Sequence, residues 1–280
     1  MLKNFNNKVV VVTGASSGMG RSYAMLLAQH NARLILTDID EDGLRLTNEA
    51  LVKLGYNQAI LMTHDVSKST DWQRVVARCK SEFGLCHMLI NNAGIEGAAA
   101  PVWVSSMAAV KRTMDVNFYG VVYGTRLFLP LLAATEAAAL VNVSSVFGFI
   151  GMPNASDYCA SKFAVRGYTE ALMVELEQVH PHITVHLVHP GGVATEIARS
   201  ERTSKFKDKF LTTSSDEIVS YILQQILKNN PRIVYGNQSG RAYWGSRLLS
   251  LPTLKKMIAK GIKRMMHPDD YRSDHKGFKL

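Results

Sequence analysis

The sequence is poor in cysteine, with only Cys79, Cys86 and Cys159. An odd count without tight spacing argues against a disulfide framework, and no second Cys or His pair completes a zinc site. The histidines likewise lack the spacing of metal ligands. We therefore expect reduced thiols, which are typical of the cytoplasm, and no bound metal ion.

Long hydrophobic runs are also absent. A membrane-spanning helix needs about 18 consecutive apolar residues, and no segment reaches that length. The first apolar run, Val9–Val12, is too short for the core of a signal peptide. These absences predict a cytoplasmic protein that does not cross a membrane.

Negative charge is scarce in the last part of the chain. The net charge is +9, and residues 200–280 account for all of it, with 16 Lys and Arg against 7 Asp and Glu. This asymmetry favours an anionic partner, such as a membrane surface, an acidic ligand or nucleic acid. Aromatic side chains do not interleave with the basic ones, so we expect no nucleic-acid partner.

The first two thirds of the chain alternate between short apolar runs and longer helical patterns. The runs are rich in Val, Ile and Leu, which is typical of strands buried on both faces. We expect strands at Lys8–Thr13, Arg33–Thr37, Gln58–Thr63, Met88–Asn91, Ala139–Val143, Thr184–His189 and Ile233–Tyr235. We expect helices at Arg21–Gln29, Glu41–Leu54, Ser69–Phe83, Val104–Leu132 and Tyr158–Gln178. Such repetition predicts an α/β fold with a single doubly wound parallel sheet and helices on both faces.

A glycine turn follows the first predicted strand, in the segment VVVVTGASSGMG. Gly14, Gly18 and Gly20 lie between that strand and a predicted helix. Glycines let the backbone approach a pyrophosphate, and the helix N-terminus presents N–H groups and a positive dipole end to it. The turn predicts a dinucleotide site in a Rossmann-type fold, although a tight turn without a ligand could carry the same residues.

Asp38 ends the second predicted strand, about 20 residues after the glycine turn, where an acidic side chain can bind ribose hydroxyls. A carboxylate there would repel a 2′-phosphate, and no Lys or Arg stands beside it or between Gly14 and Gly18. This favours NAD over NADP. The alternative is that Asp38 or Asp40 only caps the following helix.

Tyr158 and Lys162 form a YxxxK pair, one helical turn apart on one face. We expect the lysine ammonium to lower the pKa of the phenol from about 10, so that Tyr158 can exchange a proton with an alcohol near neutral pH. Upstream, Ser144 and Ser145 end a predicted strand, where ligands meet parallel sheets. Taken alone, a Tyr and a Lys at this spacing are also common on helix surfaces.

Together, these motifs resemble the short-chain dehydrogenase/reductase family over residues 8 to about 198. The resemblance implies an oxidoreductase with Tyr158 as its general acid and base. Ser145, 13 residues before Tyr158, would bind the substrate oxygen, and Lys162 would bridge the nicotinamide ribose hydroxyls. Asn117, in DVNFYG, would hold a water that relays protons to the lysine.

The resemblance also assigns the cofactor contacts. Asp65 would meet the adenine amino group, Asn91–Gly94 (NNAG) would stabilise the sheet and line the cofactor, and Val193 and Thr195 would contact the nicotinamide carboxamide. The full predicted set is Gly14, Ser16, Ser17, Gly18, Met19, Gly20, Asp38, Asp65, Val66, Asn92, Ala93, Gly94, Tyr158, Lys162, Pro190, Gly191, Val193 and Thr195.

Three segments line the substrate pocket in this family, and here they are Ile95–Pro101, Val146–Asp157 and Ala194–Phe210. They include Ile95, Phe147, Phe149, Ile150, Met152 and Pro153 and few charges outside their last part. An apolar lining suits a hydrophobic alcohol or ketone. The charged stretch at 196–209 is expected to act as a lid.

We expect a catalytic domain over residues 1–245 and a basic amphipathic extension over 246–280. In Leu248–Met266, apolar residues recur at helical spacing and most lysines lie elsewhere around the helix. Such a helix can lie peripherally on an anionic membrane, or it can pack on its own domain or on a partner subunit. The family commonly forms homodimers or homotetramers through the two long predicted helices.

The sequence therefore predicts an NAD(H)-dependent oxidoreductase acting on a hydrophobic secondary alcohol or ketone, such as a steroid-, retinol- or lipid-like molecule. Two alternatives stay open. One is an NADP(H)-dependent carbonyl reductase, and the other is a membrane-docking nucleotide-binding protein without turnover.

Overall fold

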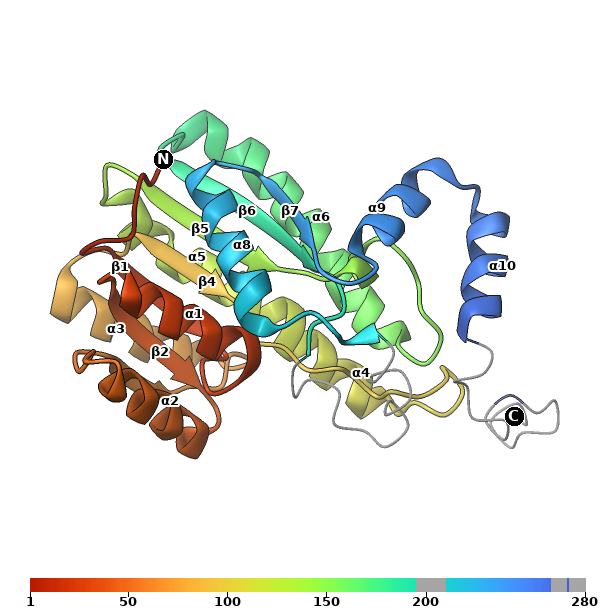
Figure 1. The fold of residues 1–280 in the computed structure, drawn as a ribbon, viewed down its shortest axis with the longest axis horizontal. Helices are drawn as coiled ribbons and strands as arrows, with labels where there is room; N and C mark the ends of the chain where they lie inside the picture. The colour runs from red at the N-terminus through yellow and green to blue at the C-terminus, as the bar shows by residue number, and fades with distance from the viewer. Residues whose placement is uncertain (195–209, 263–270, 272–280) are drawn as a thin grey trace.

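The computed structural model describes residues 1–194, 210–262 and 271. In these residues seven parallel strands form one sheet in the order β3-β2-β1-β4-β5-β6-β7 (Figure 1). The strands are β1 Val9–Thr13, β2 Arg33–Asp38, β3 Ile60–Thr63, β4 Met88–Asn91, β5 Ala138–Val143, β6 Ile183–Pro190 and β7 Arg232–Tyr235. The predicted α/β fold is confirmed, and each predicted strand has its counterpart.

Helices cover both faces of the sheet (Figure 1). They are α1 Gly18–Gln29, α2 Glu41–Lys53, α3 Ser69–Phe83, α4 Met107–Met114, α5 Gly120–Ala133, α6 Ser156–Val179, α8 Ser215–Leu227, α9 Ser239–Leu248 and α10 Leu251–Ile262. Three results differ from the sequence analysis. The long helix expected at Val104–Leu132 begins at Met107 and contains a π-helical turn at Asp115–Tyr119. The helices α8 and α9 were not predicted. The helical segment expected at Leu248–Met266 begins at Leu251, and its described part ends at Ile262.

Residues of β1 alternate between two hydrophobic cores. Val10 and Val12 belong to the core shared with α1, α2 and α8, whereas Val9 and Val11 belong to the core shared with α3, α5 and α6. All four side chains are buried, which explains why the strand has no polar alternation. The edge strand β3 differs, because alternate residues such as Leu61 are exposed.

The strand order reverses between β1 and its neighbour β4. From β1 the chain proceeds to β2 and β3 on one side, and from β4 it proceeds to β5, β6 and β7 on the other. At such a point the crossovers diverge and leave a crevice at the carboxyl ends of the strands. The predicted site residues follow these strand ends. Separately, no helix in the described ranges combines the length and apolarity that spanning a bilayer requires.

Candidate active site

The glycine turn packs tightly between β1, β4 and α1. Gly14 and Gly18 have positive φ angles of 70° and 49°. A Cβ atom at Gly14 would lie 2.9 Å from the Ala93 Cα, and one at Gly20 would lie 1.7 Å from the Gly14 carbonyl oxygen. Any larger residue at these positions would push the loop, α1 and the NNAG segment apart, so the glycines are a steric requirement here.

The first turn of α1 is open to an anion. Its N-cap residue, Ser17, makes no side-chain capping bond, and the first turn contains no acidic residue. Backbone N–H groups at a helix start have no intrahelical acceptor, and they carry the positive end of the helix dipole. A close backbone loop followed by an uncapped helix start fits the diphosphate of a dinucleotide.

Asp38 and Asp40 have separate tasks. The Asp38 carboxylate accepts hydrogen bonds from the backbone N–H groups of Ser16 and Asp40, both at 3.0 Å. Asp40 is the residue that caps α2, because its Oδ1 accepts from Gly43 N at 3.0 Å. The alternative reading of Asp38 as a helix cap is therefore wrong, and its carboxylate is held against the glycine turn.

The NNAG segment ties β1 to β4. Thr13 Oγ1 accepts hydrogen bonds from Asn92 N and Ala93 N, and Asn92 Nδ2 donates to Thr13 O at 2.9 Å. Asn91 lies deeper and donates to Asn142 Oδ1 at 2.9 Å. The segment thus fixes the floor of the crevice at the strand reversal.

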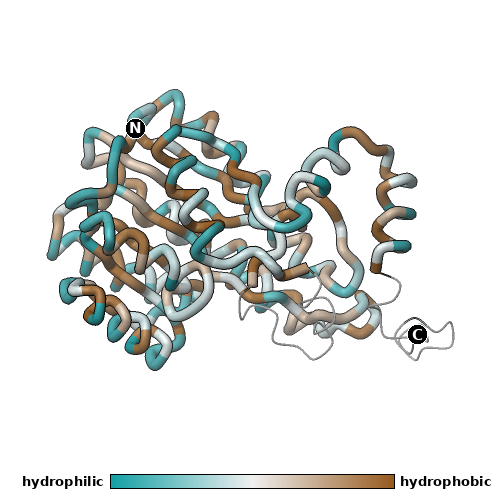
Figure 2. Tube along the Cα trace, in the orientation of Figure 1, coloured by the Kyte–Doolittle hydropathy of each residue, from teal (hydrophilic) through white to brown (hydrophobic). Residues whose placement is uncertain are grey.

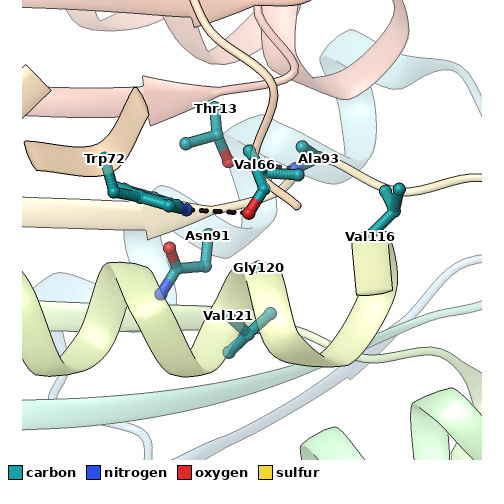
Figure 3. A pocket seen from close by; sticks show the side chains of 8 residues that line it. All are labelled: Thr13, Val66, Trp72, Asn91, Ala93, Val116, Gly120 and Val121. Atoms are coloured by element: carbon teal, nitrogen blue, oxygen red, sulfur yellow. Dashed lines mark hydrogen bonds between the residues drawn. The ribbon is translucent and has the colours of Figure 1, made fainter. Parts of the chain in front are cut away.

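A small pocket opens beside this floor (Figure 3). Strand ends and the loop after β3 line one side, and the π-helical turn and α5 line the other; the lining residues are Thr13, Val66, Trp72, Asn91, Ala93, Val116, Gly120 and Val121. Trp72 Nε1 donates to Val66 O at 2.9 Å and fixes the loop (Figure 3). The neighbouring Asp65 carboxylate accepts from Ser67 N at 3.0 Å and Oγ at 2.7 Å.

The predicted residues after β6 are only partly described. Pro190 ends the strand, and Gly191 N donates to Tyr235 O at 2.7 Å. Val193 is buried and bridges to Thr213. Thr195 and the predicted lid at 196–209 lie outside the described residues.

Tyr158 and Lys162 lie on α6, one turn apart, as predicted. The Lys162 Nζ atom is 5.6 Å from the centroid of the Tyr158 ring and donates to Val143 O at 3.0 Å. Lys162 is 3% exposed, and this burial lowers its pKa from 10.5 to about 8. The lysine is therefore anchored to the end of β5 rather than bonded to the phenol.

The expected lowering of the Tyr158 pKa is wrong for this structure. Burial is the main cause that raises the pKa of Tyr158 from 10.0 to about 12, with smaller contributions from the charges of Cys159 and Glu96. A hydrogen bond with Ser145 lowers the pKa but does not offset the burial. Desolvation disfavours the phenolate, and the Lys162 ammonium donates to Val143 O and not to the phenol oxygen.

The two serines after β5 are distinguished by their partners. Ser144 Oγ donates to the backbone carbonyl of Lys162, in α6, at 2.8 Å. Ser145 Oγ accepts from Phe147 N at 3.1 Å and hydrogen-bonds Tyr158. Of the two serines, Ser145 is therefore the one adjacent to the Tyr158 hydroxyl.

His189 holds the Ser145 loop in place. Burial lowers the pKa of His189 to about 3, so its ring is neutral and Nδ1–H donates to Ser145 O at 2.7 Å. The Phe149 ring stacks on His189 with 3.9 Å between centroids, and the Phe147 ring meets Tyr158 edge-on at 6.1 Å. Of the expected pocket aromatics, Phe147 faces the tyrosine and Phe149 supports the histidine.

Asn117 lies within the π-helical turn and is fully buried. Its Oδ1 accepts from Ile95 N at 2.8 Å, and its Nδ2 donates to Ile95 O at 2.9 Å and to Ser161 Oγ at 3.1 Å. The side chain thus fastens the segment after NNAG to α6. The water relay that the resemblance implies stays a prediction.

Asp157 is a residue that the sequence analysis missed. Its buried carboxylate accepts from Ala98 N at 2.8 Å, from Thr113 Oγ1 at 3.0 Å and from Tyr158 N at 2.9 Å. It joins the predicted substrate loop, α4 and the first turn of α6 immediately before Tyr158. The only sequence signal was an acidic residue next to the tyrosine, which also suits a helix start.

Comparisons with known proteins agree with this arrangement. The model of the short chain dehydrogenase family matches residues 8–205. SadH of Mycobacterium tuberculosis, named as an oxidoreductase, is 34% identical over 276 residues, covering 94% of this chain and 98% of that protein. Cyclohexanol dehydrogenase of an Acinetobacter species is 33% identical over 240 residues, covering 85% and 94%.

A solved structure extends the likeness to the whole fold. A short-chain dehydrogenase/reductase from Burkholderia phymatum in complex with NAD is 28% identical, with a TM-score of 0.78, covering 98% of this chain and 100% of that chain. The chain belongs to the short-chain dehydrogenase/reductase family and is an oxidoreductase. Solved relatives are complexed with nicotinamide dinucleotides: NAD in the Burkholderia structure, and NADPH in a short chain dehydrogenase from Escherichia coli that is 27% identical with a TM-score of 0.74, covering 82% of this chain and 97% of that chain. Among the residues that the structure describes, no three His, Cys, Asp or Glu side chains gather as metal ligands.

Proposed function

We propose that this protein is an NAD(H)-dependent oxidoreductase that converts a hydrophobic secondary alcohol and its ketone. The supporting observation is that Ser145 and Tyr158 share a hydrogen bond at the carboxyl edge of the sheet, where β5 ends, with only β4 between β5 and the strand that leads into the glycine turn. Parallel sheets bind ligands at this edge. Bound nicotinamide supplies or accepts the hydride, and the protein supplies orientation and the proton path.

Tyr158 is proposed as the proton donor and acceptor. With a pKa of about 12, the phenol is protonated near neutral pH and is ready to donate its proton to a ketone oxygen. In the oxidation direction the hydroxyl must first lose its proton. We therefore expect the oxidation rate to rise with pH across the alkaline range, whereas the reduction rate stays level until the phenol begins to ionise.

The neighbouring residues are proposed to orient the reactants. Ser145 would hydrogen-bond the substrate oxygen and stabilise the charge that develops on it. Lys162, fixed at Val143 O, would hold the nicotinamide ribose, and Asn117 would keep the segment at Ile95 in place. Phe147 beside Tyr158 supports an apolar substrate.

Asp38 is proposed to select NAD. Its carboxylate is already held toward the glycine turn by Ser16 N, where a ribose hydroxyl could donate to it and a 2′-phosphate would be repelled. The test is the initial rate with NAD⁺ and with NADP⁺ over secondary alcohols of increasing size, including cyclohexanol and sterols. A rate that requires NAD⁺ and increases with apolar size supports the proposal.

Two variants on neighbouring segments test whether Asp38 itself determines the choice of cofactor. Asp38→Ser should raise the KM for NAD⁺ by about tenfold or more, because a hydrogen bond to a charged group contributes about 1.5–3 kcal/mol. Asp42→Ser removes an exposed carboxylate on α2 and should leave both cofactor constants unchanged. Preference of the wild type for NADP⁺ would refute the role of Asp38 and leave the family assignment intact.

The remaining proposals concern the setting of the enzyme. We propose a homodimer or homotetramer paired through α5 and α6, because Phe163 and Val174 are exposed three turns apart on one face of α6. Three unpaired, buried cysteines support a reducing, cytoplasmic setting. The division after residue 245 falls within α9 and stays a proposal.

A further inference from the structure

The helices α9 and α10 form an arm that projects beyond the end of the sheet (Figure 1). Its base is anchored by the buried Ser239 and Ala242, and the Tyr243 ring meets Phe149 at 5.3 Å. α10 turns down from the end of α9, and Leu254 in its first turn lies next to Gly245 in the last turn of α9. The corner between the two helices, residues 248–250, lies at the top of the arm in Figure 1.

Large apolar side chains gather at this corner, which we call the arm tip and define as Trp244, Leu248, Leu249 and Leu251. Their exposed fractions are 57%, 74%, 37% and 76%. Trp244 and Leu248 are one turn apart on α9, and Leu251 begins α10. Figure 2 shows the corner between α9 and α10 as a hydrophobic stretch. Single exposed apolar residues are ordinary, but four within eight positions mark an interaction surface.

The arm carries positive charge only. Between residues 239 and 262 the sequence has five basic residues and no Asp or Glu. All five are exposed: Arg241, Arg247, Lys255, Lys256 and Lys260. Arg247 lies directly before Leu248 and after Trp244, and its guanidinium lies 4.5 Å from the Tyr243 ring centroid. Lys255 and Lys256 follow the tip by one turn, so cations flank the apolar corner on both sides.

We propose that the arm docks on the surface of an anionic lipid membrane, with the arm tip among the headgroups and the flanking cations on lipid phosphates and carboxylates. An exposed Trp and leucines next to basic residues match the boundary between acyl chains and headgroups. Basic residues near such a surface are attracted by its negative potential. A second copy of this chain fits poorly, because a symmetric contact through the tip would place one set of cations against another.

Docking would also orient the catalytic site, a consequence that rests on the proposed function. Tyr243 at the base of the arm contacts Phe149, which stacks on the His189 that holds Ser145. The arm is therefore anchored next to the loop between Ser145 and Tyr158. An apolar substrate dissolved in the bilayer would reach the site from the side on which the arm is bound.

The experiment is co-sedimentation of the full chain with vesicles of phosphatidylcholine alone and with roughly a quarter phosphatidylserine. The wild type should sediment with the anionic vesicles, and salt should weaken the binding. Leu248→Ser/Leu251→Ser and Lys255→Gln/Lys256→Gln should each reduce the partition coefficient by about tenfold or more, since a basic residue contributes about fivefold near such a surface.

Matched controls alter the same chemistry elsewhere. Leu46→Ser/Val52→Ser removes two apolar side chains on α2 that are each 50% exposed, and Lys53→Gln/Lys80→Gln removes two exposed lysines. Both should bind as the wild type does. Thermal unfolding of every variant checks folding, and sedimentation needs no turnover, so the result does not depend on the proposed chemistry.

Three outcomes would overturn the proposal. They are a wild type that stays in the supernatant, equal binding to neutral and anionic vesicles, and arm-tip variants that bind as well as the controls. If the arm-tip variants instead shift the oligomeric state on size-exclusion chromatography without changing vesicle binding, a second copy covers the tip and the membrane proposal is refuted.

Discussion

Lys162 is a buried cation whose replacement should separate stability from activity. The side chain is 3% exposed, and its Nζ donates to Val143 O at 3.0 Å. Burial lowers its pKa from 10.5 to about 8, so folding places a largely protonated amine in an unfavourable environment at neutral pH. We expect Lys162→Met to be more stable than the wild type without cofactor and to be almost inactive.

The size of the effect follows from the pKa. A lowering from 10.5 to about 8 corresponds to about 3 kcal/mol of unfavourable free energy when the amine is charged. Methionine fills a similar volume without charge but loses the hydrogen bond to Val143, worth about 1 kcal/mol. The net gain in the free energy of unfolding should be about 2 kcal/mol at pH 7.

The stability gained by Lys162→Met should decrease as the pH rises. Because the pKa in the folded state is below that in the unfolded state, the unfolded protein binds more protons between about pH 8 and 10.5. The wild type is therefore stabilised as the pH rises through this interval, and the variant is not. The advantage of Lys162→Met is full below pH 8 and shrinks toward pH 10.5.

Urea unfolding of both proteins without cofactor, at neutral and at alkaline pH, measures this difference. Lys80→Met, on the exposed surface of α3, is the control and should show no such pH dependence. Turnover should fall by about 10²-fold, the cost of misplacing a reactant, because Lys162 is proposed to hold the nicotinamide ribose. A variant less stable than the wild type at neutral pH, or a difference that does not change with pH, would refute the reasoning.

Three further substitutions test the site. Tyr158→Phe should lower kcat by about 10²–10⁴-fold, while NADH binding, followed by fluorescence, survives; turnover at the wild-type rate would remove the proposed role. Ser145→Ala should lower kcat by about 10²-fold. Ser144→Ala should keep kcat but lower the free energy of unfolding by about 1 kcal/mol, because the Lys162 carbonyl loses a hydrogen bond. The reverse pattern would contradict the role proposed for Ser145. The Asp157 carboxylate accepts three hydrogen bonds, and in Asp157→Asn one amide N–H would face a donor, so the free energy of unfolding should fall by about 1–3 kcal/mol. The KM for the substrate should rise more than the KM for the cofactor. Equal rises in both would indicate a general packing defect.

Much of the fold and the positions of the motifs could be predicted because their causes are local. Buried strands have continuous apolar runs, and the turn between β1 and α1 needs glycine at Gly14 and Gly20 for steric reasons that the spacing reflects. The missed helix α8 also had a local signal. Ser214 caps Glu217 N, and Ile218 and Ile222 follow at helical spacing.

What the sequence analysis missed depends on tertiary contacts. The spacing of Tyr158 and Lys162 places them on one face, but the pKa of the phenol is set by burial and by an ammonium directed to Val143. Asp157 could not be recognised because its partners, Ala98 and Thr113, come from other elements. Exposure of the arm tip is likewise a property of the folded chain.

The number of residues in the π-helical turn at Asp115–Tyr119 affects the geometry of the active site. Such a turn accommodates one more residue than an α-helix does over the same rise. Deleting one residue there would let 107–133 close as a continuous α-helix with α4 and α5 nearly in place, so the change would be confined to the turn itself. Asn117 lies in this turn and binds Ile95 N and O, so the closed helix would redirect its side chain and release the segment at Ile95. Among relatives of this chain, a one-residue gap in this turn would therefore indicate a different active-site geometry even where every motif residue is retained.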